Sequence, residues 1–223
     1  MNANVVQDRL QVDRARSMTP GRWYTAIKRL IDVVGSGVGL IVLSPFLAAI
    51  ALTIRLDSPG PVIFRQERLG RYGVPFVMYK FRSMRTVGGS SRQGPLVTAR
   101  GDQRVTQVGR FLRRHKLDEL PQLANVLRGQ MSLVGPRPEV DRYARAYPTE
   151  YGRILSVPPG ITDFATLEFH REEDILAHAI DTEKAYVEQV LPAKIRLYLR
   201  YIEERSVRTD LLLIGRTLGR IAR

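Results

Sequence analysis

The chain of 223 residues contains no cysteine, which excludes disulfides, thiolate metal sites and cysteine nucleophiles. Histidine is nearly as scarce: only His115, His170 and His178 occur, and their spacing fits no zinc motif. Common nucleotide-binding and nucleophile motifs are also missing, among them G-x-x-x-x-G-K-[ST], G-x-G-x-x-G after a strand, the kinase set and G-x-S-x-G. There is no D-x-D pair to hold a metal. Any phosphate binding must therefore depend on arginine and lysine side chains and on helix N-termini.

Positive charge is present in excess and is unevenly distributed. The net charge is +13, and residues 60–137 alone hold 15 Lys and Arg against 4 Asp and Glu. A basic block of this size indicates an anionic partner: nucleic acid, phospholipid headgroups or a phosphorylated small molecule. A solvated basic face would give the same composition. With 44% hydrophobic residues, the chain is large enough for one domain with a core.

One segment is apolar enough to enter a membrane. Residues 33–54 carry no charge, and a helix of this length covers ~33 Å, enough to cross a bilayer. The run begins late and no A-x-A cleavage site follows it, so a signal peptide fits poorly. A buried core helix is the alternative, but the run is long and has no polar stripe.

The ends and the centre of this run favour a re-entrant helix. Proline at Ser44-Pro45 removes a backbone hydrogen bond at the centre, where a bend is expected. Positive residues flank both ends, which draws both toward the cytoplasm. We expect a flexible arm over residues 1–22, a re-entrant helix over 23–57 broken at Ser44 and Pro45, and a folded domain over 58–223.

The rest of the chain predicts a helix-rich α+β fold with a small β-hairpin. The C-terminal stretch is a basic amphipathic helix, which either lies on an anionic membrane surface or packs on the core. "VGPRP" and "VPPGIT" predict irregular backbone between helices. The expected hairpin strands are 61–66 and 75–84, the Gly/Ser loop is 86–95, the helices lie around 103–114, 119–129, 139–154 and 182–205, and the amphipathic stretch is 210–223.

The stretch "RRHKLDELPQL" (residues 113–123) places Asp118 and Glu119 directly after a basic run. Asp118 is an acceptable helix N-cap, with Glu119 in the first turn and Pro121 tolerated there. The functional alternative is a carboxylate nucleophile or a Mg²⁺ ligand. A carboxylate repels a diphosphate, so this alternative needs cations nearby.

Several cations are candidates for binding phosphate. Lys80 and Arg82 are two residues apart in a predicted strand and therefore share a face. Arg104 follows Asp102, and Arg137 stands between two prolines that stiffen its backbone. Each of these side chains alone is typical of a solvated surface, and it is their concentration in one block that favours a site.

The motifs "FRQERLG", "KFRSM", "RVTQVGRFLRRHKLDELPQLANVLRGQMSLVGPRPE" and "PPGIT" follow the Ser-Pro apolar segment in this order. This arrangement closely resembles the bacterial sugar transferase family, the small monotopic phosphoglycosyl transferases. The resemblance covers nearly all of residues 24–223. It implies a catalytic domain over 58–223 on the cytoplasmic face of the bacterial inner membrane, with membrane phospholipids as partners and amphipathic helices on the membrane surface.

The resemblance also implies an activity: transfer of a sugar-1-phosphate from a UDP-sugar to undecaprenyl phosphate, with release of UMP and with Mg²⁺ as cofactor. This would be the first membrane step of surface glycan assembly, in exopolysaccharide, O-antigen, capsule or glycoprotein glycan. It implies that Asp118 is the nucleophile of a covalent aspartyl-phosphosugar intermediate. Glu119 would support Mg²⁺ or proton transfer, so both dyad carboxylates are candidate metal ligands. Lys80 and Arg137 become phosphate-binding residues by motif, with Arg82 and Arg104 as weaker candidates.

One segment departs from the common family pattern. "DFATLEFHREEDIL" stands where many members have Gly-Trp-Ala, so Asp163, Glu168 and His170 line either a different sugar pocket or a surface loop. The sugar, the glycan pathway and a homodimer stay open. The alternative function is a membrane-tethered basic nucleic-acid-binding protein, but the sequence contains no nucleic-acid module, so no nucleic-acid partner is expected.

Overall fold

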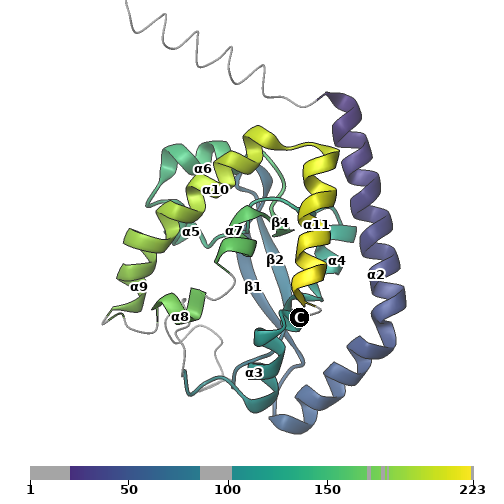
Figure 1. Cartoon of the computed structure of the whole chain (residues 1–223). Coiled ribbons are helices and arrows are strands. Elements are labelled where there is room, and N and C mark those ends of the chain that lie inside the picture. Colours follow the sequence, from purple (N-terminus) through teal and green to yellow (C-terminus); the bar gives the residue numbers. More distant parts are fainter. Residues whose placement is uncertain (1–20, 86–101, 170–171, 177–178, 180, 222–223) are drawn as a thin grey trace, which may run out of the picture.

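The structure is a computed structural model that describes residues 21–85, 102–169, 172–176, 179 and 181–221. Most of the predicted arm (1–22) and the predicted Gly/Ser loop (86–95) lie outside these residues, as does His170. The chain folds into one long helix lying along the side of an α+β domain (Figure 1). The helix-rich α+β prediction is confirmed.

The helices and strands follow in this order. They are α2 (Arg22–Asp57), β1 (Ile63–Leu69), the 3-10 turn η1 (Arg71–Gly73), β2 (Pro75–Phe81), α3 (Gln107–Arg114), the 3-10 turn η2 (Leu117–Glu119), α4 (Gln122–Leu127), β3 (Ser132–Val134), α5 (Asp141–Ala144), α6 (Pro148–Ile154), β4 (Gly160–Thr162), α7 (Phe164–Glu168), α8 (Glu172–Leu176), α9 (Thr182–Ala185), the π-turn η3 (Tyr186–Val190), α10 (Leu191–Glu204) and α11 (Val207–Ile221).

The predicted hairpin is confirmed: β1 and β2 pair antiparallel, with Phe64 opposite Lys80. At its turn Tyr72 adopts a left-handed conformation with φ 59°. The sequence did not predict the second sheet, in which β3 and β4 pair in parallel. The residue after β3 and the first residue of β4 approach so closely that a Cβ on Gly160 would lie 2.1 Å from the backbone nitrogen of Gly135. Glycine is therefore required there, and the "GPRP" and "PPGIT" motifs are held side by side.

The main core forms between α6, α10, α11 and β3. Its fully buried members include Val134, Leu191, Tyr198 and Leu213. The C-terminal helix α11 packs on this core through Leu213, which confirms one of the two alternatives for this segment. Other α11 leucines, Leu211, Leu212 and Leu218, are nevertheless exposed.

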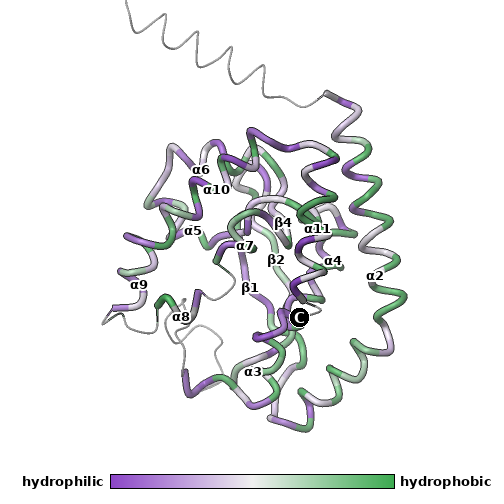
Figure 2. The backbone as a smooth tube through the Cα atoms, viewed as in Figure 1, coloured by the Kyte–Doolittle hydropathy of each residue, from purple (hydrophilic) through white to green (hydrophobic). Residues whose placement is uncertain are grey.

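Among the described residues, α2 is the one helix long and apolar enough to cross a membrane by length and composition, and only 11% of its most apolar window is buried. That exposure does not fit the core-helix alternative. Figure 2 shows the hydrophobic residues continuing along its length. The exposed apolar side chains of α2 are Trp23, Ile27, Leu30, Val33, Val34, Val38, Ile41, Val42, Phe46, Leu52 and Leu56.

Both ends of α2 are bound to the same domain. Near the N-terminal end, Lys28 donates to the Val134 carbonyl (2.8 Å) and to Asp210 (2.9 Å). One turn later the buried Asp32 accepts from the Leu133 backbone N–H (2.8 Å). At the other end Ile50 and Ile54 are buried in a small cluster with Phe81 and Leu112. The apolar middle of the helix thus lies between two attachment regions.

The helix continues through Ser44 and Pro45 but changes direction in its lower half (Figure 1). Pro45 has no N–H to donate to the Ile41 carbonyl one turn earlier. The Ser44 hydroxyl donates to that carbonyl instead, at 2.8 Å. The Ser-Pro pair therefore produces a bend without leaving the Ile41 carbonyl unsatisfied, which is the condition for any bend inside a membrane.

Candidate functional site

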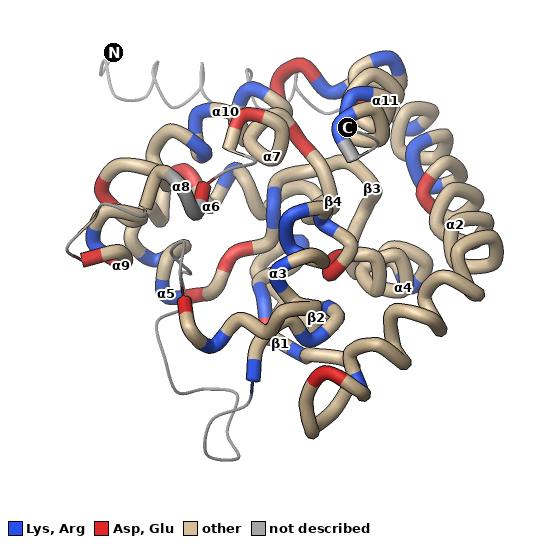
Figure 3. The backbone as a smooth tube through the Cα atoms, turned by 60° about the horizontal axis from the view of Figure 1, so that its bottom comes forward, with Lys and Arg blue, Asp and Glu red and all other residues tan. Residues whose placement is uncertain are grey.

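The "KFRSM", "LDELPQ" and "GPRP" motifs meet at one place. Lys80 comes from β2, Asp118 and Glu119 from η2, and Arg137 from the loop after β3. Figure 3 shows basic and acidic segments gathered there, around β2 and α3. Lys80 and Arg137 are 57 positions apart in the chain. They meet at one site because the hairpin packs on η2 and α4.

Glu119 is held by both cations. Its carboxylate accepts from Lys80 Nζ at 3.3 Å and from Arg137 Nη1 at 2.9 Å, and Arg137 Nη2 makes a second, very close contact. Burial alone would raise the pKa of Glu119, but the charges of Arg137 and Lys80 outweigh it and hold that pKa well below its ordinary value. Glu119 is therefore a buried, ionised residue whose charge is compensated within the protein.

Asp118 has a different environment. It is 6% exposed, and its Oδ1 atom is buried with no hydrogen-bond partner among the described residues. The N-cap alternative is wrong, because Asp118 lies inside η2, where Lys116 is the N-cap, and Pro121 precedes α4. Burial raises the pKa of Asp118, and the neighbouring Glu119 charge raises it further. A buried carboxylate oxygen without a partner is costly unless a ligand or a reaction uses it.

Lys80 completes the cluster. Burial lowers its pKa to about 8, against the attraction of Glu119. Lys80 and Arg137 together balance the charges of Asp118 and Glu119. These four groups therefore sum to zero charge when all are ionised, and both cations pair with Glu119 rather than with Asp118. Lys116 and Arg113 are further cations whose charges lower the pKa of Asp118.

The two weaker candidates lie in other environments. The Arg82 guanidinium is buried and donates to the carbonyls of Ile54 (3.1 Å), Ser58 (2.6 Å) and Pro59 (2.8 Å) at the end of α2. Arg104 forms a paired contact with Asp102, including 2.6 Å from Nη2 to Oδ2. The structure does not bring either guanidinium to Asp118, and their role in phosphate binding stays a prediction.

A buried polar layer lies beside Arg137, and most of it had no signal in the sequence. Asp163 caps α7 by accepting from the Thr166 N–H at 2.6 Å, while its Oδ2 has no partner in the described structure. The hydroxyls of Tyr151 and Tyr198 are likewise buried without partners there. Burial raises the pKa of Asp163, and the hydrogen bond from Thr166 and the charge of Arg137 oppose this effect only in part. Glu168, by contrast, is exposed on α7.

A divalent cation at this site would depend chiefly on Asp118. No group of three or more acidic or histidine residues with metal-binding geometry occurs in the described part of the chain. Glu119 is already satisfied by Lys80 and Arg137, so Asp118 is the carboxylate of the dyad that can accept an incoming ion. Mg²⁺ commonly takes one or two carboxylates together with substrate phosphates and water, and a single free carboxylate oxygen meets that requirement.

The fold and the site together define an α+β protein with one long, exposed apolar helix and a buried acidic dyad set between cations. A profile of the bacterial sugar transferase family matches residues 23–223. The chain belongs to the bacterial sugar transferase family.

Individual relatives agree with this assignment. The chain is 36% identical over 225 residues to the UDP-N-acetylgalactosamine-undecaprenyl-phosphate N-acetylgalactosaminephosphotransferase of Aeromonas hydrophila, covering 99% of this chain and 49% of that protein. It is 40% identical over 202 residues to the UDP-glucose:undecaprenyl-phosphate glucose-1-phosphate transferase of Escherichia coli (strain K12), covering 86% of this chain and 39% of that protein. A relative of the same name from Caulobacter vibrioides is 40% identical over 196 residues, covering 86% of this chain and 68% of that protein. The chain thus spans half or less of the first two relatives.

Proposed function

We propose that this protein transfers a sugar-1-phosphate from a UDP-sugar to undecaprenyl phosphate and releases UMP, as the first membrane step of surface glycan assembly. The observation that carries the proposal is the partnerless Oδ1 of buried Asp118 beside a fully paired Glu119. Family membership and the names of the relatives supply the substrate class. They also favour this function over nucleic-acid binding. The names of the relatives differ in the sugar, so the sugar is left open.

The reaction proceeds in two displacements at phosphorus. Asp118 attacks the β-phosphorus of the UDP-sugar, the bond from that phosphorus to the bridging oxygen breaks, and UMP leaves with the electron pair. A phosphate oxygen of undecaprenyl phosphate then attacks the aspartyl-phosphosugar. The bond between Asp118 and phosphorus breaks, and the carboxylate is regenerated. Covalent catalysis of this kind lets two anionic substrates use one electrostatic environment in turn.

Each neighbour of Asp118 has a defined part in this proposal. Glu119 fixes Lys80 and Arg137 through its ion pairs, and the remaining N–H groups of these cations are offered to substrate phosphates. Mg²⁺, held by Asp118 and by substrate oxygens, would supply additional positive charge for the diphosphate. Asp163, with its free Oδ2, is the acceptor available for a sugar hydroxyl beside Arg137.

The membrane arrangement is also a proposal. We propose that α2 is re-entrant, with the domain resting on the cytoplasmic face of the inner membrane. The attachment of both ends of α2 to one domain and the bend near Ser44-Pro45 support it. In this arrangement the exposed leucines of α11 would contact the phospholipids of the same membrane that α2 enters. Tags at the N-terminus and the C-terminus are both expected on the cytoplasmic side, and a periplasmic N-terminal tag would exclude the re-entrant arrangement.

The nucleophile is tested by trapping. Incubation with a radiolabelled UDP-sugar in the absence of acceptor should leave labelled phosphosugar on the full-length chain and release UMP. Asp118→Asn should abolish both the label and turnover. Asp141→Asn, which alters an exposed surface aspartate paired with Arg145, serves as the matched control and should leave both unchanged. Full turnover by Asp118→Asn would exclude Asp118 as the nucleophile.

A further inference from the structure

Lys116 is held in an unfavourable backbone conformation directly before the acidic dyad. Its φ of 56° and ψ of 19° lie in the left-handed region, which costs most non-glycine residues free energy because the Cβ approaches the following carbonyl. Besides Tyr72, it is the one non-glycine residue with positive φ among the described residues. Glycine or asparagine would adopt this conformation more readily. Strain of this kind persists where the surrounding structure enforces it, commonly at functional sites.

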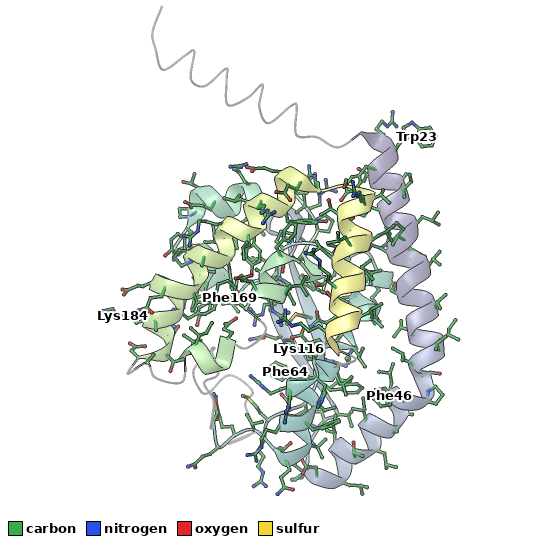
Figure 4. All side chains as sticks on the ribbon, in the orientation of Figure 1. Trp23, Phe46, Phe64, Lys116, Phe169 and Lys184 are labelled. Atoms are coloured by element: carbon green, nitrogen blue, oxygen red, sulfur yellow. The ribbon has the colours of Figure 1, made fainter. Side chains whose placement is uncertain are left out.

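The Lys116 side chain is not explained by packing. It is exposed, and its ammonium makes no hydrogen bond or ion pair with the described residues. The turn it begins carries Asp118 and Glu119, both of which are buried. Because Lys116 is the N-cap of this three-residue turn, its backbone directly adjoins the segment that carries both carboxylates. Figure 4 shows Lys116 in the middle of the molecule, whereas Lys184 lies at its edge on α9.

The charge balance of the site calls for such a residue. Lys80 and Arg137 are matched by Asp118 and Glu119, so these four buried groups together offer no net positive charge to an incoming anion, and any excess must come from cations around them such as Lys116 and Arg113. A substrate phosphate brings at least one negative charge into this neutral cluster. A cation that is free, close to the dyad and still exposed can meet that phosphate without first breaking an ion pair.

We propose that Lys116 is a phosphate-binding residue of this site, and that the left-handed turn serves to direct its ammonium toward the phosphate of an arriving substrate. The inference rests on the proposed function and adds a residue to it. The UDP-sugar diphosphate and the polyprenyl phosphate share this chemistry, and the experiment below separates the two sources.

The test compares two substitutions that relieve the same kind of backbone strain at different places. Lys116→Asn removes the strain together with the charge. Tyr72→Asn removes the strain at the exposed hairpin turn, which precedes β2, whereas Lys80 lies near the other end of that strand. Lys184→Asn removes an exposed positive charge far from the site. For the full-length chain in detergent, the dissociation constants of UDP and of a short polyprenyl phosphate are measured by calorimetry, together with the melting temperature.

Lys116→Asn is expected to raise the dissociation constant for UDP about tenfold, the loss of one charged hydrogen bond. Its melting temperature should equal or exceed that of the parent protein, and Lys116→Arg should retain most of the affinity. If the dissociation constant rose for polyprenyl phosphate and not for UDP, Lys116 would bind the acceptor phosphate, which would equally support the proposal. Unchanged affinity for both probes would overturn it, as would an equal loss in Tyr72→Asn or Lys184→Asn.

These binding measurements are independent of turnover. Failure of the proposed function would appear as absence of labelled intermediate and of UMP release in the parent protein. Failure of the inference about Lys116 would appear as unchanged dissociation constants in a parent protein that does bind UDP. A parallel assay with anionic phospholipid vesicles checks a third source of phosphate. If Lys116→Asn lost vesicle binding but kept its affinity for both probes, Lys116 would be a membrane contact and the proposal would be overturned.

Discussion

Arg137 and Glu119 form a two-nitrogen ion pair, in which Arg137 Nη1 lies 2.9 Å from Glu119 Oε2. Arg137 does not form this pair with the neighbouring Asp118. The consequence is a division between two adjacent carboxylates: Glu119 is satisfied and positions the cations, whereas Asp118 retains a free, buried Oδ1. Two adjacent carboxylates thus acquire different chemistry from their different partners.

The first prediction concerns Glu119→Gln. This change leaves Lys80 and Arg137 buried without their shared counter-ion, so we expect a loss of roughly 3 kcal/mol in the free energy of unfolding and a large fall in turnover. Denaturant unfolding in detergent measures the first and UMP release the second. Glu67→Gln, at an exposed position of β1, is the matched control and should change neither. An unchanged unfolding free energy in Glu119→Gln would show that the ion pairs do not form in solution.

The same ion pairs predict a pH dependence of stability. The pKa of Glu119 is lower in the folded protein than its ordinary value of 4.5, which is the value expected in the unfolded chain. The contribution of Glu119 is therefore complete above about pH 4.5 and is lost as the pH falls toward the folded-state pKa. Melting temperatures measured from pH 7 downward should fall more steeply in the parent protein than in Glu119→Gln. Parallel curves would contradict the prediction.

A second pH dependence concerns activity. Asp118 must be ionised to attack, and burial raises its pKa above the ordinary 3.8, so activity should rise with pH on the acidic side. On the basic side activity should fall through about pH 8, where Lys80 loses its proton. The profile of UMP release is thus expected to be bell-shaped. Lys80→Arg, whose guanidinium does not titrate in this range, should move the basic limb upward and leave the acidic limb in place; an unmoved basic limb would assign it to another group.

Substitution of Arg82 distinguishes a structural role of this residue from a phosphate-binding role. Arg82→Gln removes donors from the carbonyls that end α2, and we expect the melting temperature to fall by several degrees. Because these bonds lie at the end of α2, the Michaelis constant for the UDP-sugar should stay within about twofold of the parent value. Arg65→Gln, at an exposed position of β1, provides the control. A higher Michaelis constant at unchanged melting temperature would instead support Arg82 as a phosphate-binding residue.

The bend of α2 is tested at Ser44 and Pro45. Pro45→Ala restores an N–H that can donate to Ile41, so the helix should straighten and turnover in membranes should decrease. Ser44→Ala removes the hydroxyl that donates to the same carbonyl and should cost about 1 kcal/mol. Cysteine-accessibility mapping of the chain ends reports the topology, and the chain has no cysteine of its own to interfere. An unaltered topology and activity in Pro45→Ala would show that proline does not determine the bend.

Local patterns predicted the elements whose structure depends on neighbours in sequence. The alternating runs around Phe64 and Phe76 predicted the hairpin, and the uncharged run predicted α2, because side-chain periodicity follows backbone geometry directly. The β3–β4 sheet was not predicted, since its strands of three residues are too short to carry a pattern. The sequence did not decide whether Asp118 is an N-cap or a nucleophile, because an aspartate before a helical pattern is compatible with both roles.

The sequence by itself determined the apolar helix, its Ser-Pro bend, the basic block and the family, because all of these depend on local composition or on contiguous motifs. Only the tertiary structure decided which cation meets which carboxylate. It joined Lys80 and Arg137 to Glu119, directed Arg82 to the end of α2 and left Asp118 without a partner. The reason is that ion pairing and burial depend on distances across the fold, between residues up to 57 positions apart in the chain.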